Sequence, residues 1–333
     1  MNSVGIDISK GRSTIAVMRP FGEVAISPFE VRHTDSELSE LARRLKSLNG
    51  ETRVVMEATG NYHAPVAKQL HDAGLYVSVV NAKLVHGYGN NDLRRVKTDR
   101  KDAIKLANYG LDRWLTLPRY IPEENTRLLL KNCYRQYRQY SKVQTVLKNN
   151  LISLLDMTFP NANRLFNSPA RADGSEKWVD FVAEFWHCEC VSERPLKSFV
   201  NKYWRWCRKH GYNFSEEKAH AIYDEASGHI GVMPKSETTK LLVEQAVSQL
   251  SATSAALAVL KQEMQSLSSQ LPEYPVVMDM FGVGPTLGPQ LIAEIGDVRR
   301  FYSKKALVAY AGIDAPPNDS GDVIGRHKSM SKV

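Results

Sequence analysis

The chain has 333 residues, and its 44 lysines and arginines outnumber its 36 aspartates and glutamates, which gives a formal net charge of +8. Hydrophobic residues make up 43% and charged residues 24%, a globular composition that excludes a disordered, collagen-like or disulfide-stapled protein. No apolar run approaches the ~18 residues of a membrane span, and no signal peptide follows Met1. With only four cysteines, these features predict a cytoplasmic protein without membrane contact, for which nucleic acid is the favoured partner.

The positive charge is concentrated in the first half of the chain. Residues 1–120 carry a net +5 and residues 121–160 a net +3, whereas residues 161–235 carry +1 and residues 236–333 carry −1. A polyanion held by electrostatic attraction is therefore expected to contact the first 160 residues.

In the first third of the chain, segments with the two-residue period of strands alternate with segments that have the period of helices. Strands are expected over 4–8, 13–18, 24–29, 53–57 and 75–80, and helices follow Thr34 and cover 62–73 and 99–111. The first three strands have short connections and are expected to be antiparallel neighbours, whereas helices separate the later strands. This order predicts an α/β domain in which an antiparallel meander leads into parallel crossovers, unlike a doubly wound Rossmann domain.

The remainder is predicted to be largely helical. One long helix is expected over 125–157, and residues 160–235, which hold four of the five tryptophans, read as an inserted subdomain. From Ser236 the apolar positions recur every seven residues: Val243, Leu250, Leu257, Met264 and Leu271. This pattern predicts a coiled coil, formed either with a second copy or by packing within one chain. The expected division is 1–120, an α/β domain; 121–160, a long helix; 161–235, the insertion, of unknown role; 236–272, the coiled-coil helix; and 273–333, a C-terminal domain.

Four carboxylates occupy positions that the predicted fold brings together. Asp7 lies in the first strand and Glu57 ends the fourth, and these strands are plausible neighbours in the sheet. Asp99 and Asp102 are three residues apart at a helix start and so share a face. Converging acids would repel one another unless divalent cations such as Mg²⁺ bound between them, and two such ions can support phosphodiester exchange. Each acid taken alone also suits a turn, a strand edge or a helix cap.

Other residues fit contacts with nucleic acid. A basic run surrounds the helix start: Arg94, Arg95, Lys97, Arg100 and Lys101. Further on, Gly282 and Gly284 form a glycine-spaced turn before an apolar helix, as in helix-hairpin-helix elements that offer backbone N–H groups to phosphates. The alternatives are a solvated loop for the basic run and a plain helix junction for the glycines. Ser320 lies in a polar, turn-rich loop and has no local feature of a nucleophile.

Two weaker patterns fall in the insertion. Residues 187–190 (HCEC) contain metal-ligand residue types but lack the second pair that a zinc site needs. Residues 203–209 interleave aromatic and basic side chains, which suits either stacking on single-stranded RNA or, preferably, an amphipathic core helix.

Together these motifs resemble the DEDD-type insertion-sequence transposases, the bridge-RNA-guided recombinase family related to the Piv DNA invertase. The resemblance rests on residues 5–10 (GIDISK), 56–62 (MEATGNY), 79–81 (VVN) and 97–103 (KTDRKDA), and near the other end on 282–285 (GVGP), 309–313 (AYAGI), 320–321 (SG) and 331–332 (SK). It covers both ends of the chain and leaves 160–235 unmatched.

This resemblance implies a RuvC-like domain of ribonuclease H fold in which Asp7, Glu57, Asp99 and Asp102 bind Mg²⁺. It also implies a helical transposase domain in which Ser320 is the nucleophile that forms a covalent phosphoserine link to DNA. The implied partners are donor and target DNA, a structured noncoding guide RNA and further copies of the chain, as a dimer or tetramer, in a nucleoid-associated setting. The family continues beyond the SK motif, so the C-terminal domain is expected to be truncated here.

Three other functions fit parts of the sequence. A resolvase-like nuclease for Holliday junctions would use the four acids without the serine. A non-catalytic nucleic-acid-binding protein would use only the basic half and the glycine hairpin. Residues 5–10 also resemble the first phosphate loop of actin-like ATPases, but the sequence has no second phosphate loop of the kind that fold requires.

Overall fold

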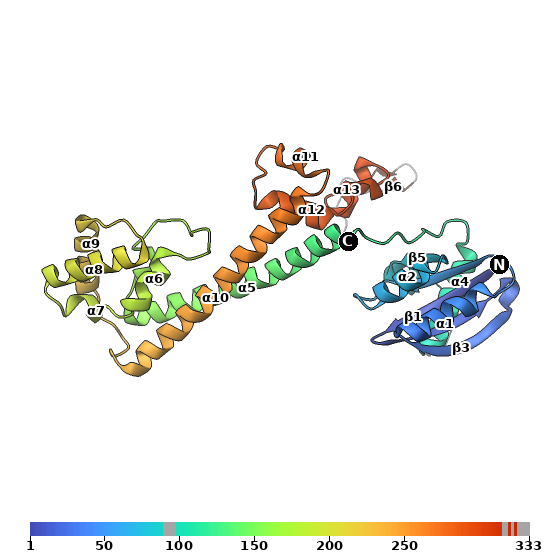
Figure 1. Ribbon diagram of the computed structural model, residues 1–333, viewed down its shortest axis with the longest axis horizontal. Coiled ribbons are helices and arrows are strands. Elements are labelled where there is room, and N and C mark those ends of the chain that lie inside the picture. The colour runs from blue at the N-terminus through green and yellow to red at the C-terminus, as the bar shows by residue number, and fades with distance from the viewer. Residues whose placement is uncertain (89–97, 315–318, 321–322, 325–333) are drawn as a thin grey trace. The chain divides into compact units, whose positions relative to one another are not determined.

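The computed structural model describes residues 1–88, 98–314, 319–320 and 323–324. The chain divides into two compact units, Met1–Glu123 and Glu124–Val333 (Figure 1). Within the described residues, no helix is both long enough and apolar enough to cross a membrane.

The first unit is a five-stranded mixed sheet with helices on both faces. Its elements are β1 (Asn2–Ser9), β2 (Arg12–Met18), the short helix η1 (Pro20–Gly22), β3 (Val24–Arg32), α1 (Asp35–Lys46), β4 (Thr52–Glu57), α2 (His63–Asp72), β5 (Tyr76–Val80), α3 (Ala82–His86) and α4 (Asp99–Asp112). The strand order is β3-β2-β1-β4-β5. Strands β1, β2 and β3 pair antiparallel, whereas β1, β4 and β5 pair parallel. This topology confirms the predicted ribonuclease H-type α/β domain.

Alternate residues of the central strand β1 serve the two faces of the sheet. Val4, Ile6 and Ile8 are buried in one core with residues of α1 and α2. Gly5 lies under α4 on the opposite face, where Val55 of β4 packs with Leu106 of α4. Helix α4 therefore packs across one face of the central strands.

The second unit is mostly helical. Its elements are α5 (Asn125–Thr158), η2 (Ala162–Arg164), α6 (Lys177–Glu184), α7 (Glu189–Ser192), α8 (Leu196–His210), α9 (Glu216–Gly228), α10 (Glu237–Ser269), α11 (Tyr274–Met278), α12 (Leu287–Ile295), η3 (Val298–Arg300), α13 (Lys304–Tyr310), β6 (Asp319–Ser320) and β7 (Val323–Ile324).

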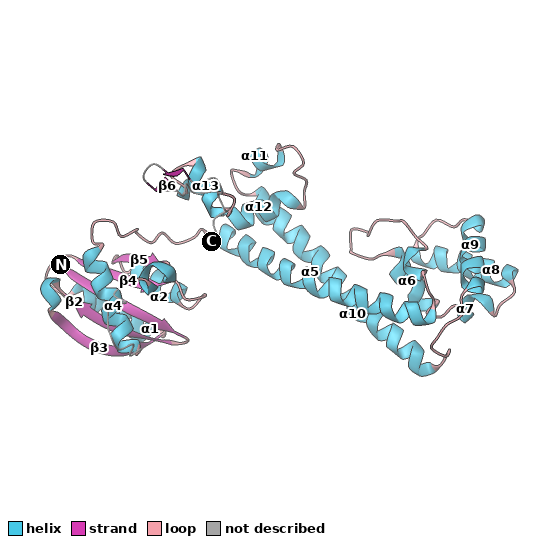
Figure 2. Cartoon of the chain, turned by 180° about the vertical axis from the view of Figure 1, so that it is seen from behind, coloured by secondary structure: helices cyan, strands magenta, loops and turns pink. Residues whose placement is uncertain are grey.

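The long helices α5 and α10 pack along each other as an antiparallel pair (Figure 2). Leu151 near the end of α5 shares a core with Val243 near the start of α10, and Leu130 near the start of α5 shares a core with Met264. All five residues of the predicted sevenfold register, Val243 to Leu271, are buried. The sequence left open whether these residues pack against a second copy or within one chain. In the structure they pack within one chain.

The insertion between these helices has a core of aromatic rings. Tyr203 and Trp206 of α8 are buried at 2% exposure or less, and their rings stack at 5.7 Å between centroids. Trp204 lies on the outer face, where Arg208 covers its ring at 4.9 Å. The preferred interpretation of residues 203–209, an amphipathic core helix, agrees with this arrangement.

Candidate functional site

Asp7 and Glu57 lie at the same level of two neighbouring strands. In the parallel ladder of β1 and β4, Ile6 pairs with Met56, so Asp7 and Glu57 are the next residues along each strand. Because Ile6 and Met56 point into the core under α1 and α2, the two carboxylates belong to the α4 face. Both residues are half-buried.

Helix α4 approaches this face so closely that only glycine fits beneath it. A Cβ atom on Gly5 would lie 2.0 Å from the carbonyl oxygen of Ala103 and 2.4 Å from the backbone nitrogen of Ala107. Farther along, a Cβ on Gly110 would lie 2.3 Å from the Oγ of Ser3. Helix α4 thus runs antiparallel to β1. Its N-terminus lies toward the end of β1 that carries Asp7.

The first turn of α4 carries the second pair of carboxylates, Asp99 and Asp102, toward the strand ends at which Asp7 and Glu57 lie. Thr98 caps the helix by accepting a hydrogen bond from the backbone N–H of Lys101 at 3.3 Å. Asp99 is exposed and Asp102 is half-buried, and their spacing of three places them on one side of the helix. The helix dipole favours acids at this position, so their placement also has a structural explanation.

The donor set suits a hard divalent cation, which prefers carboxylate oxygens. Glu57, Asp99 and Asp102 make no ion pair or side-chain hydrogen bond with any other described residue. Among the described residues, however, no group of three or more His, Cys, Asp or Glu side chains is arranged to hold a metal ion. The backbone therefore brings the four predicted acids to one edge of the sheet, while their side chains are not gathered around a common point.

The basic run is only partly described. Arg94, Arg95 and Lys97 lie outside the described residues. Arg100 and Lys101 are exposed in the first turn of α4. Both lie between the two aspartates in sequence, so they add positive charge at the start of the helix, where an anion could be neutralised.

The glycine hairpin exposes its backbone. Gly282 has a positive φ of 79°, and a Cβ added at Gly282 or Gly284 would meet no described atom within 4 Å. The neighbouring side chain of Phe281 is fully exposed. Residues 274–298 contain no lysine or arginine, so the hairpin offers backbone N–H groups without nearby cations from its own segment.

Ser320 lies in strand β6, which pairs antiparallel with β7 so that Ser320 is opposite Val323. The sequence predicts a loop at this position, and the structure has a two-residue strand instead. Ser320 belongs to the second unit and the four acids to the first.

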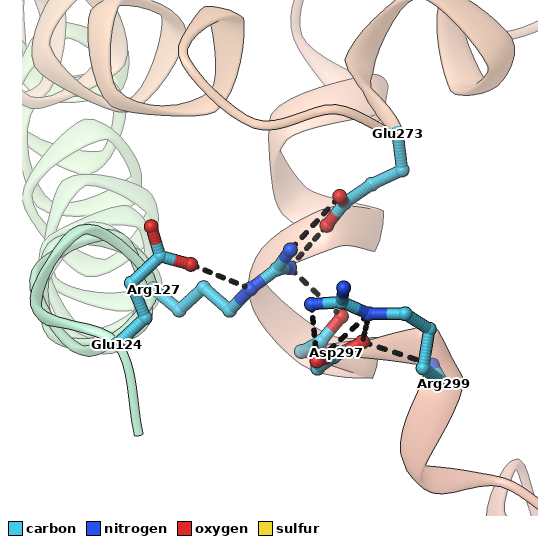
Figure 3. A network of polar contacts seen from close by, with 6 residues as sticks. Glu124, Arg127, Glu273, Asp297 and Arg299 are labelled. Atoms are coloured by element: carbon cyan, nitrogen blue, oxygen red, sulfur yellow. Dashed lines mark hydrogen bonds and ion pairs between the residues drawn. The ribbon is translucent and has the colours of Figure 1, made fainter. Parts of the chain in front are cut away.

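A buried arginine ties the start of α5 to the C-terminal helices (Figure 3). The side chain of Arg127 is 5% exposed and forms a two-pronged ion pair with Glu273, which is 18% exposed. It also donates a hydrogen bond to the carbonyl oxygen of Gly296 at 3.4 Å and pairs with Glu124 at 3.3 Å. These contacts join α5 to the segments that precede α11 and follow α12.

The same network holds its acids in the charged form. The hydrogen bond from Arg127 lowers the pKa of Glu273, and the hydrogen bonds from Arg299 lower the pKa of Asp297 to about 2. Sequence reasoning missed this network because Arg127 and Glu273 are 146 residues apart. The one available signal was a charged residue, Arg127, on the side of a long helix that also carries apolar residues.

The HCEC segment is structural in the described chain. His187 is buried, and its two ring nitrogens contact the carbonyl oxygen of Met233 at 3.0 Å and the backbone N–H of Glu189 at 3.2 Å. Burial raises the pKa of the Cys190 thiol, which disfavours the thiolate form.

Comparison with known proteins gives matches at both ends of the chain. Residues 4–160 match a family model of DEDD transposases of the IS110 type, described as "Transposase". Residues 274–333 match the model described as "Transposase IS116/IS110/IS902 family". The 44.8 kDa protein of insertion element IS116 from Streptomyces clavuligerus is 23% identical over 97% of this chain and 78% of its own length.

Other matches cover less of the chain. The pilin gene-inverting protein of Moraxella bovis is 27% identical over 40% of this chain and 38% of its own length. Among solved structures, RuvC of Thermus thermophilus aligns with 36% of this chain at 16% identity, over 100% of its own length, with a TM-score of 0.26. The structure of that RuvC in complex with a Holliday junction substrate aligns with 36% at 13% identity, over 99% of its own length, with a TM-score of 0.27.

Proposed function

Since the chain belongs to the IS116/IS110/IS902 family of transposases, we propose that it is the recombinase of an insertion sequence, which cuts DNA strands and rejoins them to new partners. The observation that carries this proposal is the placement of α4 across Gly5. It sets Asp99 and Asp102 at the edge of the sheet that carries Asp7 and Glu57. A relative named as a gene-inverting protein also fits exchange between two DNA sites.

In this proposal Asp7, Glu57, Asp99 and Asp102 hold Mg²⁺. Their oxygen donors are those that this ion prefers. Bound Mg²⁺ would stabilise the charge that develops on a phosphate during strand cleavage. Arg94, Arg95, Lys97, Arg100 and Lys101 would neutralise neighbouring phosphates, and the exposed backbone at Gly282 and Gly284 would contact another part of the strand.

Ser320 is proposed as the nucleophile. Its Oγ attacks the scissile phosphorus and loses its proton to a base in the site. A bond forms between Oγ and phosphorus as the bond from phosphorus to one deoxyribose oxygen breaks, and that oxygen takes up a proton. The phosphoserine link conserves the energy of the cleaved bond, and attack by a deoxyribose hydroxyl of the new partner strand releases the serine.

We further propose that site selection and assembly involve other molecules. A structured noncoding RNA would pair with donor and target DNA, so that base pairing carries much of the sequence specificity. Homo-oligomers, dimers or tetramers, would bring Ser320 of one copy to the acids of another. Both proposals derive from the resemblance of the motifs to guided recombinases.

The test is a covalent adduct between protein and labelled DNA that survives denaturation, measured with the guide RNA and Mg²⁺ present. The wild-type chain should form the adduct, and peptide mapping should place it on Ser320. Ser320→Ala should abolish the adduct, and Glu57→Gln should reduce it by at least 100-fold, comparable to removing one catalytic group.

Two exposed residues provide matched controls, Ser251→Ala on α10 and Glu217→Gln on α9, and both should retain the adduct. An adduct that persists in Ser320→Ala overturns the serine mechanism. If that variant still cleaves DNA in Mg²⁺, the chain acts as a resolvase-like nuclease instead. DNA binding without cleavage by the wild-type chain would identify a non-catalytic binding protein.

A further inference from the structure

The charged residues of helix α5 are almost all basic. Six of the seven are lysine or arginine, and Asp156 is the exception. The two outermost bases are neutralised within the chain, Arg127 by Glu273 and Lys148 by Glu176 at 2.8 Å. The other four follow one another at steps of four, three and four residues, which places them on one face of the helix. We call these four residues the α5 stripe: Lys131, Arg135, Arg138 and Lys142.

The charge of the stripe is largely uncompensated. Arg135, Arg138 and Lys142 are exposed, and none of the three forms an ion pair with another described residue. At a rise of 1.5 Å per residue the stripe is about 16 Å long. A row of cations of this length can contact more than one phosphate of a strand that lies along it.

A small hollow lies beside the stripe, where α12 packs on α5. Its volume is about 160 Å³, and its lining combines Lys131, Tyr134, Arg135 and Arg138 of α5 with Ala293, Glu294 and Tyr310. Pockets for small molecules typically measure about 300–1,000 Å³. The hollow is therefore the size of a contact for one group of an extended ligand.

The two tyrosine rings of the hollow are backed by guanidinium groups. Arg300 lies over the ring of Tyr310 at 4.6 Å, and Arg138 lies over the ring of Tyr134 at 5.8 Å. The hydroxyl of Tyr310 donates a hydrogen bond to the carbonyl oxygen of Glu294 at 3.1 Å. Glu294 is the one carboxylate in the lining, against three cations. Aromatic rings beside cations are the arrangement by which proteins bind single strands, with bases stacked and phosphates neutralised.

We propose that the α5 stripe and its hollow bind a single strand of DNA. The stripe contacts the phosphates, and Tyr134 or Tyr310 stacks against a base. A single strand fits better than a duplex, because paired bases are not free to stack on a ring in so small a hollow. This inference rests on the proposed function, since strand exchange exposes single strands, and it assigns such a strand to a surface of the second unit.

The experiment measures binding of the full-length chain to three labelled oligonucleotides of the same sequence, as single-stranded DNA, duplex DNA and single-stranded RNA. EDTA is present, so that cleavage plays no part. The test variant is Arg135→Gln with Arg138→Gln. The control is Arg205→Gln with Arg208→Gln on α8, which changes two exposed arginines at the same spacing. Circular dichroism checks that both variants remain folded.

The stripe variant should bind single-stranded DNA more weakly, and its slope of log affinity against log salt should fall by about 1.4, since each phosphate contact on a single strand contributes about 0.7. A third variant, Tyr310→Ala, should weaken binding without changing that slope. The control should bind as the wild type does.

Several results would overturn the inference. These are an unchanged affinity for single-stranded DNA, an equal loss in the α8 control, or a loss confined to the duplex or to RNA. Because the measurement involves no chemistry, none of these results would affect the adduct test of the proposed function. If the adduct test fails, the result of the binding experiment is in turn unaffected.

Discussion

At the scale of single residues, Gly5 matters more to the candidate site than its chemistry suggests. It has no side chain to bind anything, yet its missing Cβ lets the backbone of α4 lie against β1. That approach fixes where Asp99 and Asp102 stand relative to Asp7. A glycine in the middle of a strand normally weakens it, and here the close packing of α4 explains why it is present.

We predict that Gly5→Ala destabilises the first unit by about 3 kcal/mol, because the new methyl group would overlap backbone atoms of Ala103 and Ala107 that cannot rotate away. Thermal or urea unfolding measures the change. Gly284→Ala is the matched control, since its Cβ would meet no described atom within 4 Å, and its stability should be unchanged. Equal stability of the two variants would show that α4 does not lie where the structure places it.

The residues of the site differ in how well the sequence predicted them. Asp7 and Glu57 were predictable as a pair because the expected strand order makes the first and fourth strands neighbours, whereas their common level follows from the register of that ladder, in which Ile6 pairs with Met56. The spacing of Asp99 and Asp102 likewise fixes their common helix face. The close approach at Gly5 was not predictable, since it depends on the position of a helix about 100 residues later in the chain. Ser320 was selected only through the family resemblance, and its local sequence gave no independent sign.

At the scale of elements, the C-terminal helices are anchored to the helix pair by the polar contacts of Arg127 together with apolar contacts. Arg127 is almost fully buried, and its charge is compensated by Glu273. Below it, Leu130 packs with Met264 and Ile292. The apolar contacts hold α5, α10 and α12 together, while the ion pair fixes the orientation of the segments around α11 and α12.

We predict that Arg127→Met lowers the free energy of unfolding of the second unit by about 3 kcal/mol, because the mostly buried carboxylate of Glu273 would lose its partner. Thermal unfolding followed by circular dichroism measures this. Arg299→Met removes an exposed arginine from the same network and should change stability little. The interpretation fails if Arg127→Met with Glu273→Leu is as unstable as Arg127→Met alone, since removing both charges should restore much of the loss.

The sevenfold pattern of α10 shows what periodicity can and cannot decide. It correctly marks the buried face of a long helix from Val243 to Met264, and also Leu271, which is buried just past the end of that helix. The pattern does not identify the helix that packs against α10, because a second copy and another helix of the same chain would bury an apolar stripe equally well. The partner α5 lies about 100 residues earlier and has a less regular pattern. Ser254, which is also buried on α10, bonds to Gln144 of α5 at 2.9 Å, a detail that no apolar pattern encodes.

At the scale of the whole molecule, the two units have separate cores. The hydrophobic clusters of the first unit contain residues up to Tyr120 only, and those of the second begin at Leu130. The excess positive charge also has two locations, the first unit and the stripe on α5. Counting charge by segment predicted both regions, but only the helix geometry shows that four of the bases in the second region share a face.

We predict that residues 1–123 fold when expressed alone, because their sheet, its covering helices and its cores are complete within that range. The fragment should show a cooperative unfolding transition and a dispersed amide spectrum by nuclear magnetic resonance. The fragment 1–98, which lacks α4, is the control and should lack both. A disordered spectrum for 1–123 would mean that the first unit depends on the helices that follow it.

The antiparallel pair of α5 and α10 also sets a length. Its two apolar ends, at Leu130 and Leu151, are 21 residues apart, which at 1.5 Å per residue is about 32 Å. One turn of duplex DNA measures about 34 Å. The pair therefore holds the insertion and the C-terminal helices apart by close to the length of one such turn. Removing seven residues from each helix would preserve the packing face and shorten that distance by about 10 Å, so that spacing could be changed without altering any contact at either end.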